Sequence, residues 1–174
     1  MNKILFCLVG VICLFSLRVN AQYAQGDKLL NLGIGVNSYY SGGIPFSASF
    51  EYGVTDEISV GAGLDYLNYN YKSSGYKYGF SILYFGARGS YHFNELLNLT
   101  IEELDLYGGA SLGFRSFSWK DDFNNSGLGN SYGNGVFFGI HAGARYYFAP
   151  SIGGFLEVGA GGSSNAKLGV AFRF

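Results

Sequence analysis

Apolar and polar side chains alternate along most of this chain. The last nine residues show the pattern most clearly: Ala166, Leu168, Val170, Phe172 and Phe174 take every second position, and polar or small residues stand between them. Because successive side chains of a β-strand point to opposite faces, the pattern predicts a strand with one apolar and one polar face. A chain that ends on such a strand suits a closed barrel whose last strand pairs with its first.

The same alternation occurs in seven earlier segments. The eight predicted strands are residues 30–36, 46–54, 58–66, 83–93, 104–115, 136–148, 152–160 and 166–174. Strands of about 9–11 residues tilted near 45° cross the hydrocarbon core of a bilayer. Membrane barrels of one chain have an even number of strands, an apolar outside and a polar inside. We therefore predict an all-β fold, an eight-stranded antiparallel transmembrane up-and-down β-barrel.

A soluble sandwich or a lipocalin-type barrel would place the apolar face inward instead. The polar face favours the membrane barrel, because it is rich in glycine, as a narrow interior requires. It also carries six charged residues on six predicted strands: Glu51, Asp65, Arg88, Arg115, Arg145 and Glu157. We expect these charges to pair in the lumen and fill it. The alternative is a narrow pore for ions or small solutes, whose salt bridges open and close.

The N-terminal segment has the features of a secretion signal. Lys3 precedes an apolar run over residues 4–17, and a small residue, Ala21, ends a cleavage sequence. We predict that residues 1–21 are removed and that residues 22–174 form one outer-membrane barrel domain. A lipoprotein anchor at Cys7 or Cys13 is the competing interpretation, but a bulky residue precedes each cysteine. Removal of the leader also removes both cysteines.

Composition narrows the possible functions. The predicted mature chain keeps nine basic and twelve acidic residues, with no basic stripe, so we expect no nucleic-acid partner. The chain is unusually rich in three residue types, with 28 glycines, 15 tyrosines and 16 phenylalanines. We expect no cofactor and no metal, because no third ligand accompanies the two histidines.

The connections between strands divide into two groups. Residues 55–57, 94–103 and 149–151 would be periplasmic, and residues 41–45, 72–77, 120–134 and 161–165 would face outward. Leucines and Ile101 in residues 94–103 suggest one helical turn on the membrane surface. Residues 120–134 form the longest polar stretch. They would either contact an extracellular partner, through Asp121, Asp122, Phe123 and Tyr132, or form a mobile hydrophilic cap.

Aromatic residues gather near both ends of the predicted strands, where rings prefer the headgroup level of a membrane. The expected outer girdle is Tyr39, Tyr40, Tyr69, Tyr71, Tyr76, Tyr78 and Trp119, and the expected inner girdle is Tyr91, Phe93, Tyr146, Phe148, Phe172 and Phe174.

Ser90 and His92 share a face of one predicted strand, which raises the question of a hydrolase. Lipid-A deacylase barrels use the order His-x-Ser at the outer leaflet, whereas this chain has Ser-x-His near the periplasmic end. We therefore expect Ser90 and His92 to be polar residues that face the lumen. A lipid-A-modifying enzyme is the second alternative function, after the narrow pore. His141 is expected to pair with Glu157 or to lie near His92.

The signal sequence, the eight amphipathic strands and the terminal Phe174 resemble the small bacterial outer-membrane barrels of the OmpX/OmpA-barrel/OmpW-like group. The Tyr- and Gly-rich texture is similar to that of the PorT-like outer membrane protein beta-barrel domain. The resemblance implies location in the outer membrane, with membrane lipid and lipopolysaccharide as neighbours. It also implies that the barrel-assembly machinery reads Leu168, Val170, Phe172 and Phe174. The implied function is structural or surface-interaction, not enzymatic.

Overall fold

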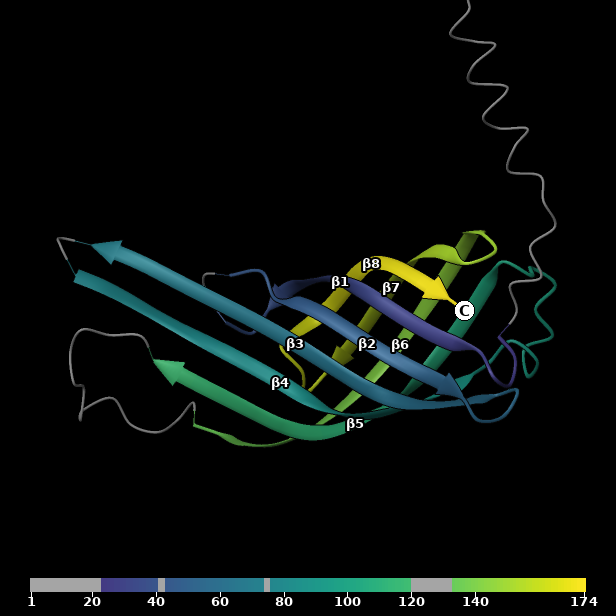
Figure 1. Ribbon diagram of the computed structural model, residues 1–174, viewed down its shortest axis with the longest axis horizontal. Helices are drawn as coiled ribbons and strands as arrows, with labels where there is room; N and C mark the ends of the chain where they lie inside the picture. Colours follow the sequence, from purple (N-terminus) through teal and green to yellow (C-terminus); the bar gives the residue numbers. More distant parts are fainter. Residues whose placement is uncertain (1–22, 41–42, 74–75, 120–132) are drawn as a thin grey trace, which may run out of the picture.

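The strands close into an antiparallel barrel (Figure 1). The computed structural model describes residues 23–40, 43–73, 76–119 and 133–174. Its strands are β1 (Lys28–Ser38), β2 (Phe46–Gly53), β3 (Ile58–Ser73), β4 (Tyr76–His92), β5 (Leu104–Trp119), β6 (Gly135–Ala149), β7 (Ile152–Ala160) and β8 (Ser164–Arg173). Each strand pairs with the next in sequence, and β8 pairs with β1. The predicted eight-stranded barrel is confirmed. None of the described segments forms a helix long and apolar enough to cross a membrane.

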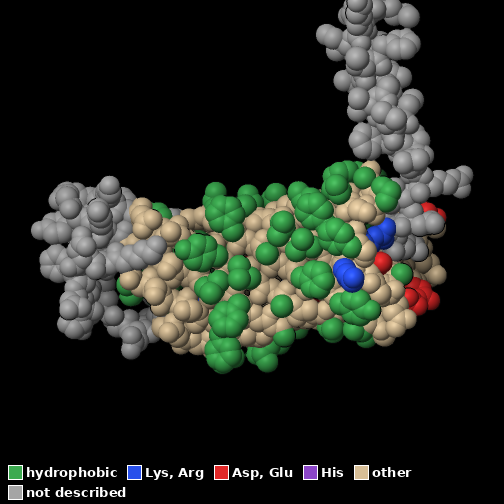
Figure 2. Space-filling model, viewed as in Figure 1, with side chains coloured by type: hydrophobic (Ala, Val, Ile, Leu, Met, Phe, Trp, Pro, Cys, Tyr) green, Lys and Arg blue, Asp and Glu red, His purple; other side chains and the backbone are tan. Residues whose placement is uncertain are grey.

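The outer surface of the barrel is apolar and the inner surface is polar. Leu112, Ile140 and Val170 point outward and are 58%, 57% and 42% exposed, whereas the inward Glu51 and Arg145 are both 0% exposed. Figure 2 shows apolar side chains spread over the wall, with the charged side chains of this face gathered near one end. A soluble barrel would bury those apolar side chains. Lipid is the solvent that suits this surface, so the barrel is of the transmembrane type.

Both ends of the described chain lie at the same end of the barrel. Lys28 N donates to Phe174 O over 3.1 Å, and Phe174 N donates to Lys28 O over 3.0 Å. We call this the terminal end, and the opposite one the loop end. The terminal end also holds the turns before β3, β5 and β7.

The barrel wall is much taller on one side. Phe46 at the start of β2 pairs with Tyr66, so residues 67–73 of β3 extend past β2, by roughly 20 Å at the usual strand rise. Figure 1 shows β3, β4 and β5 reaching beyond the other strands at the loop end. The predicted strands 58–66 and 83–93 stop short of this extension. The outward positions become polar at Asn68 and Asn70, so the membrane pattern ends while the pairing of β3 with β4 continues.

The predicted outer aromatic girdle is wrong in part. Tyr69, Phe80 and Trp119 occupy inward positions of β3, β4 and β5, and the ring centroid of Phe80 lies 5.7 Å from that of Tyr69 and 6.1 Å from that of Trp119. Tyr40 packs on the same group, 6.2 Å from Phe80, and Phe117 stacks on Phe80 at 5.6 Å. These rings contact one another above the lumen instead of lipid. The side chains of Tyr71, Tyr76 and Tyr78 lie outside the described residues.

The segment between β4 and β5 forms one hydrogen-bonded turn and no regular helix. Leu97 N donates to Phe93 O over 2.9 Å, and Leu99 N donates to Asn94 O over 3.0 Å. Leu96 and Leu97 are exposed there. Contact of this turn with the membrane surface stays a prediction.

Candidate functional site

The lumen contains an ion-paired network, which we treat as the candidate site. Its side chains stand at alternate positions of the strands, and the pleat therefore directs all of them inward. Glycine makes room for them: Gly61 separates Glu51 from Arg88 in the row across β2, β3 and β4, and a Cβ at this glycine would come within 1.8 Å of the carbonyl oxygen of Phe50. The close approach of these backbones requires glycine.

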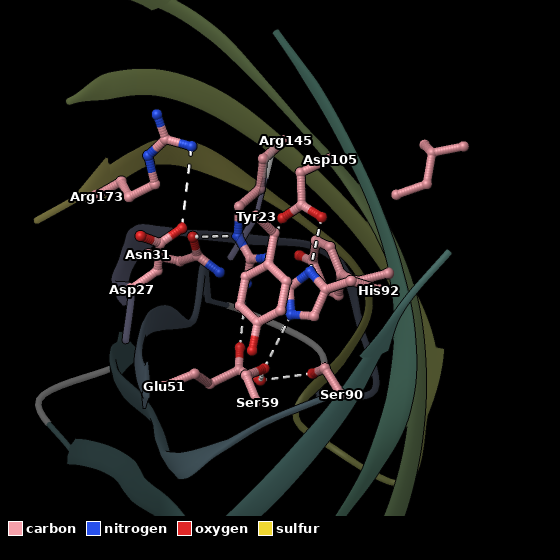
Figure 3. A network of polar contacts seen from close by, with 12 residues as sticks. Tyr23, Asp27, Asn31, Glu51, Ser59, Ser90, His92, Asp105, Arg145 and Arg173 are labelled. Atoms are coloured by element: carbon pink, nitrogen blue, oxygen red, sulfur yellow. Dashed lines mark hydrogen bonds and ion pairs between the residues drawn. The ribbon is translucent and has the colours of Figure 1, made fainter. Parts of the chain in front are cut away.

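Arg145 of β6 is the centre of the network (Figure 3). Its Nη2 donates to Glu51 Oε1 on β2 over 3.1 Å, and its Nη1 donates to Asp105 Oδ2 on β5 over 2.7 Å. Its Nε donates to Asn31 Oδ1 on β1 over 3.1 Å. The guanidinium carbon also lies 3.8 Å from the ring centroid of Tyr107. One buried cation thus connects four strands with every nitrogen of its fork engaged.

The Glu51 carboxylate accepts hydrogen bonds from side chains of several strands. Ser90 Oγ donates to Glu51 Oε2 over 2.5 Å, and Ser59 Oγ donates to the same oxygen over 3.0 Å. Arg88 Nε lies 3.3 Å from Glu51 Oε1, an ion-pair contact without the alignment of a hydrogen bond. The carboxylate is therefore compensated by two guanidinium groups, as a buried charge requires.

The network continues from Arg88 toward the loop end. Arg88 Nη2 donates to Glu157 Oε2 over 2.8 Å, and Tyr107 OH donates to the same oxygen over 3.2 Å. Lys167 Nζ lies 3.9 Å from Glu157 Oε1 and donates to Asp65 Oδ1 over 2.8 Å. These contacts join β3, β4, β5, β7 and β8, so the chain of charges runs along much of the lumen.

His92, Ser59 and Asp105 have the spacing of a catalytic triad. His92 Nδ1 lies 2.7 Å from Asp105 Oδ1, and His92 Nε2 lies 3.0 Å from Ser59 Oγ. However, Ser59 is 0% exposed and donates its proton to Glu51, and the Tyr23 ring covers His92 at a centroid distance of 3.5 Å. A nucleophile needs access and an acceptor for its proton. The arrangement is that of a packed interior and does not favour a hydrolase.

Tyr23 precedes β1 in the chain, and its ring lies over His92 at the terminal end of the lumen (Figure 3). Its hydroxyl donates to Ile58 O over 2.6 Å. Burial, and next the negative charge of Asp105, raises the pKa of the Tyr23 hydroxyl above its ordinary value.

Cavities lie on both sides of the network. One of about 50 Å³ lies on the loop side, where Asp65, Tyr84 and Lys167 contribute to its lining. The other, of about 240 Å³, lies at the terminal end beside Tyr23 and His92. Arg145 and Glu51 line neither cavity. The layer around Arg145 therefore separates them.

The structure brings most of the predicted luminal charges together. Glu51, Arg88, Arg145 and Glu157 form the contacts above, and Asp65 joins through Lys167. Arg115 lies apart: its Nε and Nη2 donate to Gly133 O at the loop end, over 3.3 and 3.0 Å. Its inclusion in the network is wrong, because Arg115 stands six residues along β5 from Gly109, the partner of Ser90, and four from Ser111, which is level with Arg88 and Glu51.

Sequence reasoning missed several members of the network. Asp105, Lys167, Asn31 and Tyr107 hold or orient the charges, and the alternation that selected the other residues includes each of them. His141 contacts neither expected partner: its Nε2 lies 3.0 Å from Ser90 Oγ. Among the residues that the structure describes, no group of three or more metal-binding side chains is close enough to hold an ion.

The remaining predicted sites lie elsewhere. Leu168, Val170 and Phe174 are exposed on the outer face at the end of the chain, and Phe172 stacks against Phe174 with ring centroids 6.5 Å apart. Asp121, Asp122, Phe123 and Tyr132 lie outside the described residues, as does the predicted leader with its cleavage position.

No family model matches the chain, and no curated protein matches its sequence. Solved structures that are similar to it include the following three. The N-terminal β-barrel domain of OprF from Pseudomonas aeruginosa is 20% identical with a TM-score of 0.54, and the match covers 86% of this chain and 98% of that one. Ail, the attachment invasion locus protein of Yersinia pestis, is 15% identical with a TM-score of 0.55, covering 86% and 99%. The outer membrane protein OprG from Pseudomonas aeruginosa is 12% identical with a TM-score of 0.57, covering 90% and 99%. At these identities the likeness is one of fold, that of the small outer-membrane barrels.

Proposed function

We propose that the chain is an integral outer-membrane protein with a structural or surface-interaction role, and that its lumen does not conduct. The observation that carries the proposal is the position of Arg145, which is 0% exposed and bridges Glu51 and Asp105 across the barrel. An interior of eight strands is just wide enough for side chains to fill. We also propose that the chain belongs to the OmpX/OmpA-barrel/OmpW-like or PorT-like group of small outer-membrane barrels.

The terminal end is assigned to the periplasm. Two of its three turns are short, whereas the longest connection, between β5 and β6, lies at the loop end. Short periplasmic turns and longer extracellular loops are the rule in this class of barrel. The tall wall of β3, β4 and β5 then projects from the cell surface, with lipopolysaccharide beside it.

A planar-bilayer recording tests the closed lumen. We expect the wild-type protein to give no stable open current. A stable current that disappears in Arg145→Ala or Glu51→Ala would contradict the proposal and favour the narrow pore. Arg115→Ala is the matched control, because this guanidinium lies outside the central layer.

The surface-interaction role assigns residues 120–134 to an extracellular partner. This connection joins β5 to β6 on the projecting side of the barrel. Replacing it with a short Gly-Ser linker should abolish binding of the cells to the partner surface, while the amount of barrel in the outer membrane stays unchanged. An unaltered binding phenotype would remove this part of the proposal. Unchanged lipid A after deletion of the gene would exclude the lipid-A-modifying alternative.

A further inference from the structure

A short segment before β1, residues 23–27, covers the terminal end of the lumen. The ring of Tyr23 stacks on that of His92, with centroids 3.5 Å apart and planes inclined by 2°. Tyr23 is 7% exposed, so most of its surface is in contact with the barrel interior. Behind His92 lie Asp105 and Arg145. Tyr23 therefore stands between the network and the water at this end.

This segment is fastened mainly at the turn between β2 and β3, and the Tyr23 hydroxyl adds one bond to Ile58 O at the start of β3. Gly26 N donates to Gly53 O, Gln25 N to Asp56 Oδ1 and Gln25 Nε2 to Val54 O, each over 2.9 Å. All three acceptors belong to the turn between β2 and β3 or its border. Segments held by exposed hydrogen bonds open locally at a lower free energy than the strand ladders. Apart from the buried Tyr23 ring, the segment is held in this way, so its detachment would leave the strands paired.

Space for such a movement exists beside the ring. The terminal cavity of about 240 Å³ is lined by Tyr23, His92, Asp56, Asn94 and Glu95, among others. This space borders the phenol ring and opens toward the solvent, so the ring can swing into it without displacing a strand.

We propose that residues 23–27 form a releasable plug, which controls access of water to His92 independently of the ion-paired layer around Arg145. This inference rests on the closed lumen of the proposed function. The plug provides a second closure, which acts at the terminal end alone. A ligand or partner that binds the detached segment would hold this end open and leave the central layer in place.

Hydrogen–deuterium exchange at the Cε1 position of histidine, measured by mass spectrometry on the full-length mature protein in detergent, tests the plug. The chain has two histidines, so both signals are assigned. In Tyr23→Ala we expect the exchange of His92 to accelerate about tenfold. His141 lines a cavity on the loop side and serves as the internal control, with an unchanged rate. Tyr23→Phe keeps the stacked ring but loses the hydroxyl bond to Ile58 O, so we expect a much smaller acceleration than in Tyr23→Ala.

A second variant keeps the test valid if Tyr23→Ala folds poorly. Asp56→Ala removes the acceptor of Gln25 N and should also accelerate the exchange of His92, to a smaller extent. Equal exchange of His92 in the wild type and in both variants would overturn the plug. Equal acceleration of His141 would overturn it too, because it would indicate general loosening. A wild-type current in the bilayer experiment would refute the closed lumen, whereas a silent lumen with unaltered His92 exchange refutes the plug alone.

Discussion

Arg145 and Glu51 meet across the full width of the barrel. The two residues are 94 positions apart in the sequence, and their strands, β6 and β2, are separated by three strands on either side of the closed sheet. Their 3.1 Å ion pair thus links opposite walls of the barrel across the lumen.

Removing the central cation should destabilise the folded barrel strongly. Arg145→Met leaves Glu51 and Asp105 buried without their shared partner, and breaking a buried pair in this way costs about 3–5 kcal/mol. Adding Glu51→Gln and Asp105→Asn should restore part of the loss, because neutral amides tolerate burial better. Urea unfolding in lipid vesicles, followed by circular dichroism, measures both effects. Equal stabilities of Arg145→Met and the control Arg115→Met would contradict this prediction.

The close pairing of β4 with β5 should depend on Gly113. This residue faces Gly86, and a Cβ added to it would lie 2.2 Å from Phe85 O and 2.5 Å from Gly86 Cα. Gly113→Ala forces the strands apart, and we expect a loss of about 1–3 kcal/mol. Gly63→Ala is the control, since its nearest atom would be 3.7 Å away. A heat-modifiability gel of refolded samples compares the two variants, and equal melting would refute the argument.

The uneven wall predicts where the membrane ends. Leu112 and Ser118 stand on the same outward face of β5, but Ser118 lies on the part that projects at the loop end. Leu112→Arg should cost about 2–4 kcal/mol, as a cation near the bilayer midplane does, and Ser118→Arg should cost almost nothing. Unfolding in vesicles of defined thickness gives both values. Similar costs at the two positions would place the projecting wall inside the bilayer.

The final strand should matter more for assembly in cells than for folding in vitro. Phe174 is the last aromatic residue of the signal that the barrel-assembly machinery is expected to read. In Phe174→Ser we therefore expect less protein in the outer membrane, whereas refolding in detergent should be unchanged. Phe148→Ser alters another exposed aromatic at the terminal end and should leave the membrane level unchanged. Immunoblots of membrane fractions decide, and equal levels of the two variants would contradict the assignment.

The buried Tyr23 hydroxyl predicts a loss of stability at high pH. Burial raises its pKa, so the folded state favours the neutral phenol more than the unfolded state does. That stabilisation is complete below the ordinary tyrosine pKa of about 10 and declines as the pH rises above it. Tyr23→Phe has no proton to lose at this position. Above about pH 10, the free energy of unfolding should therefore fall more steeply in the wild type than in Tyr23→Phe.

The barrel fold could be predicted from the sequence alone. Each strand must present apolar side chains to lipid, so the alternation of apolar and polar positions is visible in every strand separately. It also selected the inward face, so Glu51, Arg88 and Arg145 were found as luminal charges. Which luminal charges meet depends on register, which no local pattern fixes. The sequence therefore predicts a luminal network that includes Arg115, whereas this guanidinium donates to Gly133 O near the loop end. Tyr23 was missed because it precedes the first alternating segment, and only the closed fold places its ring against His92.

The ion pairs across the lumen also constrain the order in which the strands of the barrel can assemble. Arg145 and Glu51, Arg88 and Glu157, and Lys167 and Asp65 each join an early strand to a late one. None of these pairs can form on a partly built sheet, and a lone guanidinium or carboxylate facing lipid would be costly. Glu51 can meet Arg88, and Asp105 can meet Arg145, while the sheet is still open. Asp65 must stay hydrated until Lys167 of the last strand arrives, so ring closure and completion of the cross-lumen pairs coincide.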